Sequence, residues 1–396
     1  MSNPTLTVAR PSFLAVCAAG LLALAIAMGI GRFAFTPMLP LMIRAGSADV
    51  AAGGWLAAAN YAGYLLGALT TARIPLTPKR IALVSLVAIV LSTAAMGLTE
   101  SVAAWMVLRL VSGVASAWAL VSISVWSLDA LARLGRPGGA GVLYAGVGVG
   151  IAIAGLYCWR AGATGVAPEG LWLQLGALAL VGLLVVAALL PREDAPPQTA
   201  SRTASTHGSA TSTSISWGLV LSYGMLGFGY ILPATFLPVL ARAVVDDPSL
   251  FGAAWPVFGA AAAVSTLLAG AVLGHHSRRH VLAGSHVLMA AGCLLPVLHL
   301  SALTVLAAAL LVGGTFMVAT MAGMQEAKAS AGNNPTHALG RMTAAFSIGQ
   351  MAGPVLSSAL SGRSTGFGGL FIALVIGALA LLGSAVWLFR TPSPAA

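Results

Sequence analysis

Charged residues are scarce in this chain. Of its 396 residues, 9 are Asp or Glu and 19 are Lys or Arg, so 7% are charged, against about 25% in a typical soluble protein. Hydrophobic residues make up 59% of the chain, and the mean hydropathy is +0.95. Such a composition cannot cover a water-facing surface, which excludes a soluble enzyme, a nucleic-acid-binding protein and a disordered chain.

Cysteine is equally sparse. The chain has three, Cys17, Cys158 and Cys293, and each lies in an apolar stretch. An odd number without metal-ligand spacing gives neither a disulfide framework nor a metal site, so we expect buried thiols that act as small hydrophobic groups. The glycine-rich stretch 141–150 follows no strand, which argues against a dinucleotide site. We therefore expect no metal and no cofactor.

Long hydrophobic runs make up most of the sequence. A bilayer core about 30 Å thick needs about 20 apolar residues per helix. The sequence predicts an all-α membrane protein with twelve transmembrane helices, in the runs 13–42, 50–72, 81–98, 101–128, 138–159, 170–190, 215–241, 249–274, 281–298, 303–325, 342–361 and 366–389.

The chain divides into two related halves. Residues 192–214 are rich in Ser, Thr, Ala and Pro and predict a flexible cytoplasmic linker. At an offset of 198 residues, Gly29-Ile-Gly31 matches Gly227-Phe-Gly229 and Leu39-Pro40 matches Leu237-Pro238. This repetition indicates an internal duplication. We expect two pseudo-symmetric six-helix bundles, at 1–191 and 215–396.

The basic residues predict an orientation. With a cytoplasmic N-terminus, 13 of them fall on the inner side and 4 on the outer side, as expected from the positive-inside rule. The net charge of +10 is then explained by membrane topology rather than by nucleic acid. The inner residues are Arg10, Arg73, Lys79, Arg80, Arg133, Arg136, Arg192, Arg202, Arg278, Arg279, Lys328, Arg341 and Arg390; the outer ones are Arg44, Arg160, Arg242 and Arg363.

Two arginines remain inside predicted spans. Arg32 lies about 18 Å from Arg44 at helical rise, and Arg109 lies about 13 Å from Glu100. A charge at this depth is costly and points to function. Asn60, Tyr61 and Tyr64 fall at a similar level, so we interpret all five as candidate substrate-binding residues. The alternatives are a structural role for Arg109 and helix-to-helix bonds for the other polar residues.

Acidic residues are missing at this depth. Asp129 and Glu326 lie near the cytoplasmic ends of their spans, where they are expected to pair with Arg133 or Lys328. His286 is a candidate for proton coupling; the alternative, which is commoner for such a residue, is a packed, hydrogen-bonded histidine. We keep these three as coupling or gating candidates. Two buried cations without a buried anion favour an anionic or carboxylate-bearing substrate.

Several motifs resemble those of the major facilitator superfamily. Arg109-Leu-Val-Ser-Gly113 is similar to its R-x-x-q-G motif, and the loops 73–80 and 270–279 are similar to its basic loop motif without the Asp. Gly349-Gln350-Met-Ala-Gly353-Pro354 is similar to an eleventh-helix pattern. More narrowly, the stretches 29–42 and 54–67 resemble the bacterial YbfB/YjiJ-type branch.

The resemblance implies a secondary transporter of the bacterial inner membrane that works by alternating access and is not an enzyme. Its expected partners are a small solute, the lipid bilayer and a coupling proton, and the expected oligomeric state is a monomer. From depth and repeat position, Tyr230 and Gln350 are expected to complete the substrate site opposite Arg32. The main alternative is a proton-driven multidrug efflux pump whose arginines are structural.

Overall fold

The computed structural model describes residues 12–190, 215–242, 244, 248–332, 334–361 and 368–391, and the predicted linker lies outside them. All regular structure in these residues is helical. The elements are α1 (Phe13–Leu24), η1 (Ala25–Phe33), α2 (Phe35–Arg44), α3 (Val50–Thr70), η2 (Thr71–Arg73), α4 (Pro78–Met96), α5 (Val102–Arg133), η3 (Pro137–Gly139), α6 (Ala140–Thr164), α7 (Pro168–Leu189), α8 (Trp217–Arg242), α9 (Pro248–Val272), η4 (Leu273–His275), α10 (Arg278–Leu298), α11 (Ala302–Ala329), α12 (Pro335–Ser361) and α13 (Gly368–Arg390).

Each of the twelve hydrophobic runs coincides with helical structure. Among the described residues, ten helices are long and apolar enough to cross a membrane. The helices α3 and α12, of 21 and 27 residues, occupy the second and eleventh runs but are not among those ten. The prediction of an all-helical membrane chain is therefore confirmed, with ten candidate spans.

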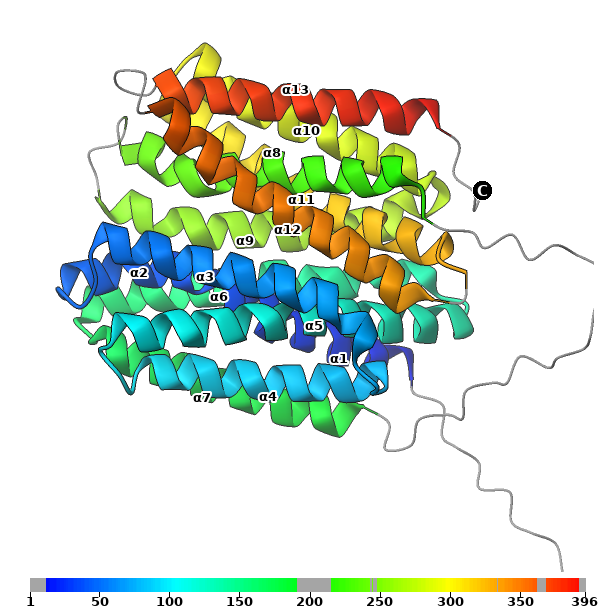
Figure 1. Cartoon of the computed structure of the whole chain (residues 1–396), viewed down its shortest axis with the longest axis horizontal. Coiled ribbons are helices and arrows are strands. Elements are labelled where there is room, and N and C mark those ends of the chain that lie inside the picture. Colours follow the sequence, from blue (N-terminus) through cyan, green and yellow to red (C-terminus); the bar gives the residue numbers. More distant parts are fainter. Residues whose placement is uncertain are drawn as a thin grey trace, which may run out of the picture.

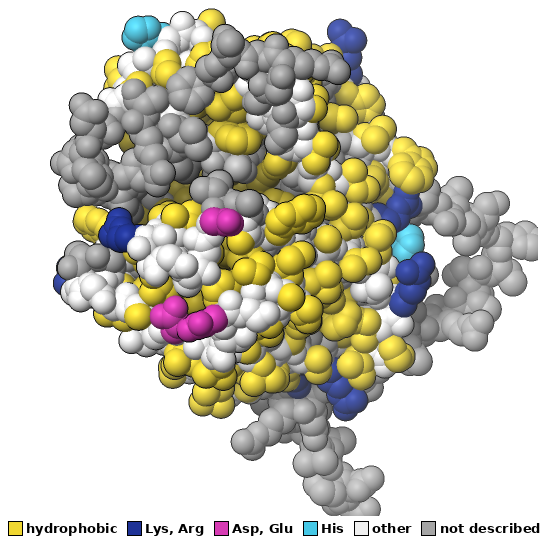
Figure 2. All heavy atoms as spheres, turned by 60° about the vertical axis from the view of Figure 1, so that its left-hand side comes forward, with side chains coloured by type: hydrophobic (Ala, Val, Ile, Leu, Met, Phe, Trp, Pro, Cys, Tyr) yellow, Lys and Arg dark blue, Asp and Glu magenta, His cyan; other side chains and the backbone are white. Residues whose placement is uncertain are grey.

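The helices lie side by side, roughly along one direction. Helices of residues 12–190 occupy the lower part of Figure 1 and those of residues 215–391 the upper part. The two parts meet where α6 packs along α9 and where α3 packs against α12. Figure 2 shows a broad hydrophobic surface, with most visible Lys and Arg side chains along the right-hand side and with the acidic side chains and some basic ones toward the left. This distribution suits a molecule whose sides face lipid.

The first predicted span is not one continuous α-helix. It is α-helical over α1, π-helical over η1 and α-helical again over α2, with Pro40 inside the last segment. In π-helical register the carbonyl of Arg32 would accept from residue 37, which is a proline without an N–H. This segment therefore leaves backbone carbonyls for other helices to satisfy.

Glycine lets α3 and α5 pack backbone to backbone. A Cβ added at Gly63 would lie 2.1 Å from the carbonyl oxygen of Leu110, and one at Gly113 would lie 2.2 Å from that of Asn60. No side chain fits in this space. Small residues at helix contacts are a usual means of close packing in membranes, and here they fix α5 next to α3 at the level of Asn60 and Arg109.

Substituting Gly63 with alanine is expected to destabilise the protein. The new methyl group must push α3 away from α5, and overpacking of this kind costs about 1–3 kcal/mol or more. Gly54, on the same helix, has no atom within 4 Å of an added Cβ, so Gly54→Ala is a matched control that should be neutral or stabilising. Thermal unfolding of both purified variants measures the difference, and equal melting temperatures would contradict the packing account.

Helix α6 carries glycines on two faces. On one face Gly146 and Gly150 contact the first span, where added Cβ atoms would meet the carbonyl oxygens of Leu21 at 2.1 Å and Ala25 at 2.4 Å. On the other face a row at seven-residue spacing, consisting of Gly141, Gly148 and Gly155, lies against α9. Seven residues are close to two helical turns. The contact between the halves of the chain therefore follows one continuous line along α6.

Candidate functional site

Arg32 lies in the π-helical segment η1 and is 3% exposed. Its Nη2 donates a hydrogen bond to Oε1 of Gln350 on α12, which joins the first span to the C-terminal half of the chain. The guanidinium lies over the ring of Tyr64 at 3.7 Å from the ring centroid and 5.4 Å from that of Tyr61. Four of the predicted site residues, Arg32, Tyr61, Tyr64 and Gln350, are thus brought together.

Hydrogen-bond donors around Arg32 are left unused. Nε and Nη1 of Arg32, Nε2 of Gln350 and the hydroxyl of Tyr230 are buried and have no hydrogen-bond partner among the described residues. No described Asp or Glu forms an ion pair with Arg32. Buried donors normally have partners. This cluster can therefore accept a ligand that supplies oxygen acceptors and negative charge.

Arg109 makes a different set of contacts. Its Nη1 and Nη2 donate to the backbone carbonyl oxygens of Gly31 at 3.1 Å and Arg32 at 3.2 Å. Ser112 Oγ donates to the same Gly31 oxygen at 2.6 Å, and Ser116 Oγ donates to the carbonyl oxygen of Ala27 at 2.7 Å. One face of α5 thus satisfies the carbonyls of the π-helical segment. These contacts favour the structural alternative for Arg109.

Asn60 belongs with Arg109 rather than with Arg32. It is fully buried, and its Nδ2 donates to the carbonyl oxygen of Arg109 at 3.0 Å. This bond ties α3 to α5 next to the close glycine contacts. Asn60 therefore orients the helix that supports the site, while its Oδ1 has no hydrogen-bond partner among the described residues.

Aromatic rings form an apolar wall beside this cluster. Phe33 of the first span packs against Trp255 at 6.5 Å and Phe316 at 6.4 Å, and Phe316 stacks on Tyr230 at 4.8 Å between ring centroids. A cavity of about 20 Å³ lies between the halves of the chain and is lined by Phe33, Tyr64 and ten other residues. It has room for about one water, so the centre is closed in this structure.

The fold and sequence match known transporters. A family model described as "Uncharacterised MFS-type transporter YbfB" matches residues 24–388. The chain belongs to this family of the major facilitator superfamily. Among solved structures, that of the human organic anion transporter MFSD10 (TETRAN) superposes with a TM-score of 0.69, covering 98% of this chain and 100% of that chain at 15% identity. At that identity the likeness shows the fold alone. No curated protein matches the sequence.

Asp129 and Glu326 of this transporter both form ion pairs. Asp129 pairs with Arg133 at 2.9 Å and with Lys328 at 3.6 Å, so that α5 and α11 are joined across the two halves of the chain. Arg133 and Lys328 are the two partners that the sequence predicted for Asp129. Glu326 instead pairs with Arg279 at 2.7 Å, in a site where both side chains are buried. The expectation of Lys328 or Arg133 as its partner is corrected.

The reason for this partner lies in helical geometry. Lys328 follows Glu326 by two positions, and side chains two apart point to different faces of a helix. Arg279, at the start of α10, lies beside α11 and reaches the buried face that Glu326 occupies. The buried pair therefore joins two helices within the C-terminal half of the transporter.

His286 lies on α10 and contacts α13. It is fully buried, and its Nδ1 is 3.0 Å from the hydroxyl oxygen of Ser384. Its Nε2 has no hydrogen-bond partner in the described part of the chain. The packed alternative is the one that these contacts favour, and a coupling role for His286 stays a prediction.

The sequence did not reveal the aromatic wall or the serine contacts. Phe316 lies in the long apolar helix α11, where a large side chain is expected to belong to the core or to face lipid. Trp255 could have been noticed in the sequence, because it occupies the position in the second half that Trp55 occupies in the first. Ser112 and Ser116 lie three and seven residues after Arg109, a helical spacing that places all three on one face of α5 and could have indicated a shared partner.

Proposed function

We propose that this protein is a secondary active transporter that moves a small organic anion, with a carboxylate group bound by Arg32, across the membrane by alternating access. The observation that carries the proposal is the environment of Arg32. This side chain is 97% buried, its Nε and Nη1 are unused, and no described acidic residue pairs with it. A charged group in such a position is stabilised by a compensating anion.

The geometry around Arg32 suits a carboxylate. A guanidinium presents parallel N–H groups that match the two oxygens of a carboxylate. Nε2 of Gln350 and the hydroxyl of Tyr230 supply further donors from the C-terminal half. Because Arg32 comes from the first span and Gln350 from α12, a bound anion contacts both halves, as substrate sites between repeats require.

The aromatic wall favours a substrate with an apolar or planar body. Rings of Phe33, Tyr230, Trp255 and Phe316 adjoin the cluster, and such surfaces bind flat apolar groups. MFSD10, which shares the fold, is described as an organic anion transporter. The central cavity of about 20 Å³ must enlarge to admit even a small acid, which alternating access provides.

The architecture proposed for this cycle has twelve spans. Residues 1–191 and 215–396 form two pseudo-symmetric six-helix bundles joined by the cytoplasmic linker 192–214, and both termini are cytoplasmic. The location is the inner membrane of a bacterium, and the working unit is a monomer. A proton is the proposed coupling ion, with His286, Glu326 and Asp129 as the candidate coupling or gating residues. The distribution of Lys and Arg supports this orientation.

Efflux of hydrophobic compounds is the second candidate. The backbone contacts of Arg109 and the aromatic cavity favour it, because both suit a pump whose substrate needs no charge. Under this alternative Arg32 has only a structural role. The unused donors of Arg32 weigh against it: among the described residues both Nε and Nη1 of Arg32 lack a partner, whereas Arg109 lacks one only at Nε.

Matched pairs of ligands distinguish the two functions. Purified protein is heated with benzoate and benzamide, with phenylacetate and phenylacetamide, and with a neutral sugar. A ligand at 100 times its Kd stabilises the folded state by about 2.7 kcal/mol. We expect the carboxylates to raise the melting temperature and their amides to leave it unchanged. Equal stabilisation by an acid and its amide would support the hydrophobic efflux alternative instead.

A further inference from the structure

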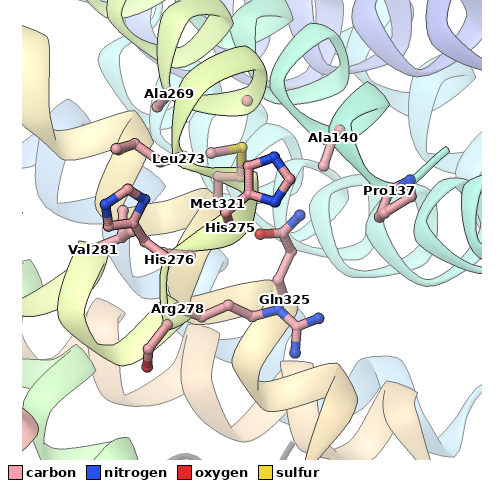
Figure 3. Close-up of a pocket in the computed structure, with 14 residues that line it drawn as sticks. Pro137, Ala140, Ala269, Leu273, His275, His276, Arg278, Val281, Met321 and Gln325 are labelled. Atoms are coloured by element: carbon pink, nitrogen blue, oxygen red, sulfur yellow. The ribbon is translucent and has the colours of Figure 1, made fainter. Parts of the chain in front are cut away.

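A second and larger cavity lies away from Arg32. Its volume is about 340 Å³, within the usual range of ligand pockets. It is lined from the C-terminal half by α9, η4, α10 and α11, and from the N-terminal half by Pro137, Gly138 and Ala140. Figure 3 shows His275, His276, Arg278 and Gln325 around this opening. Both halves of the chain therefore contribute to one cavity.

The two cavities occupy different levels of the molecule. Along α6, the central cavity is lined by Val147 and this one by Ala140, which are seven residues or about 10 Å apart. Arg278 begins α10 at the end of the molecule where Asp129 pairs with Lys328. The larger cavity therefore lies near a helix end, beyond the closed centre.

Most residues that line this cavity are apolar, and its polar groups are neutral or basic. His275, His276 and Arg278 supply imidazole and guanidinium groups, Gln325 supplies an amide, and no Asp or Glu is among the lining residues. No described acidic residue forms an ion pair with Arg278. Glu326, next to Gln325 in sequence, is engaged by Arg279. The charge facing the cavity is thus left uncompensated.

Backbone groups add to this positive potential. Ser277, the residue before α10, forms no side-chain hydrogen bond to the first turn of that 21-residue helix. The free N–H groups at a helix start and the helix dipole both favour an anion. A phosphate group matches this set, since it accepts hydrogen bonds on several oxygens from arginine, imidazole and backbone N–H groups together.

We infer that this cavity is an anion-binding site, separate from the proposed substrate site, that takes a phosphate group. Its walls come from both halves, which touch there: an added Cβ at Gly141 would lie 2.8 Å from Cα of Gly270. A bound phosphate stabilises the arrangement in which these walls are close, because separating the halves removes one wall. The site therefore gives a cytoplasmic phosphate compound a means to hold the transporter in this state.

Equilibrium binding of radiolabelled inorganic phosphate to the purified full-length protein tests the site. We expect saturable binding with one phosphate per chain. Arg278→Gln and the double variant His275→Gln/His276→Gln should each weaken binding by about tenfold or more. Arg80→Gln, an exposed arginine at the start of α4, is the matched control and should bind as the original protein does. Thermal unfolding confirms that each variant is folded.

Arg32→Gln separates this site from the proposed substrate site. Phosphate binding that survives Arg32→Gln and is lost in Arg278→Gln supports the inference, whatever the transported substrate proves to be. Binding lost in Arg32→Gln but kept in Arg278→Gln would place phosphate at the central site and overturn it. An absence of saturable binding, or equal loss in Arg80→Gln, overturns it as well.

The source of the phosphate group is resolved in lipid nanodiscs. Labelled phosphate is bound in nanodiscs of phosphatidylcholine alone and in nanodiscs that also contain phosphatidic acid. Displacement of the label by phosphatidic acid, absent in Arg278→Gln, supports a lipid headgroup as the occupant. Displacement by a soluble phosphate monoester such as glycerol phosphate, with no effect of phosphatidic acid, supports a free metabolite. Failure of both to displace the label would overturn the assignment of a lipid headgroup or a phosphate monoester as the occupant.

Discussion

Arg32→Gln is expected to reduce the affinity for a transported carboxylate by at least about 100-fold while the protein remains folded. Hydrogen bonds to charged groups contribute about 1.5–3 kcal/mol each. A carboxylate that displaces the Gln350 amide can accept two of them, one from Nη2 and one from Nε or Nη1 of Arg32. Glutamine keeps a polar side chain but removes the charge and the paired donors. Titration calorimetry with a carboxylate identified by its thermal stabilisation measures the loss, and transport by vesicles measures its effect.

Arg32→Lys is the graded control for this prediction. Lysine keeps the positive charge but lacks the planar arrangement of donors, so we expect an affinity between those of the original protein and Arg32→Gln. The melting temperature without ligand should change little in either variant, because the only hydrogen bond that the Arg32 side chain donates within the described residues goes to Gln350. Unchanged transport by Arg32→Gln would falsify the proposed role of Arg32.

Arg109→Ala is expected to damage folding rather than binding. The substitution removes two hydrogen bonds and leaves the carbonyl oxygens of Gly31 and Arg32 without those donors. The Gly31 oxygen keeps the hydrogen bond from Ser112, so one buried acceptor, the carbonyl oxygen of Arg32, is left unsatisfied. Such a group costs about 1–3 kcal/mol, a sizeable part of the usual 5–15 kcal/mol stability. Low yield and a strongly reduced melting temperature are the expected results.

Arg133→Ala provides the comparison on the same helix. Arg133 pairs with Asp129 four residues earlier, and its side chain is 62% exposed, so its loss should cost less than about 1 kcal/mol. If Arg109→Ala instead unfolded at the same temperature as the original protein but bound no carboxylate, Arg109 would belong to the substrate site. The two arginines inside the spans are thus separable by experiment.

Much of the fold was predictable because the bilayer imposes a length on each span. All twelve hydrophobic runs coincide with helices for that reason. The break in the first span was not visible in hydropathy, since a π-helical segment has the same apolar composition as an α-helix. Gly29, Gly31 and Pro37 were the local signals, but none of them alone distinguishes a kink from a change of helical type.

The candidate site was predictable in part, because depth along a helix follows from residue number. Arg32, Tyr61, Tyr64 and Gln350 were placed at one level, and they do meet. Depth does not give the direction in which a side chain points around the helix. Asn60 precedes Tyr61 by one residue, yet it faces α5 and bonds the Arg109 carbonyl.

The hydrogen bond between Arg32 and Gln350 bears on what the empty carrier can do. An arginine without any acceptor would make a closed, unloaded state costly, and the carrier could then change sides only when occupied. Here the amide oxygen of Gln350 occupies the place of a substrate oxygen. The two halves can therefore close while the substrate site is empty. We therefore expect a carrier that returns empty and achieves net flux, rather than one confined to one-for-one exchange.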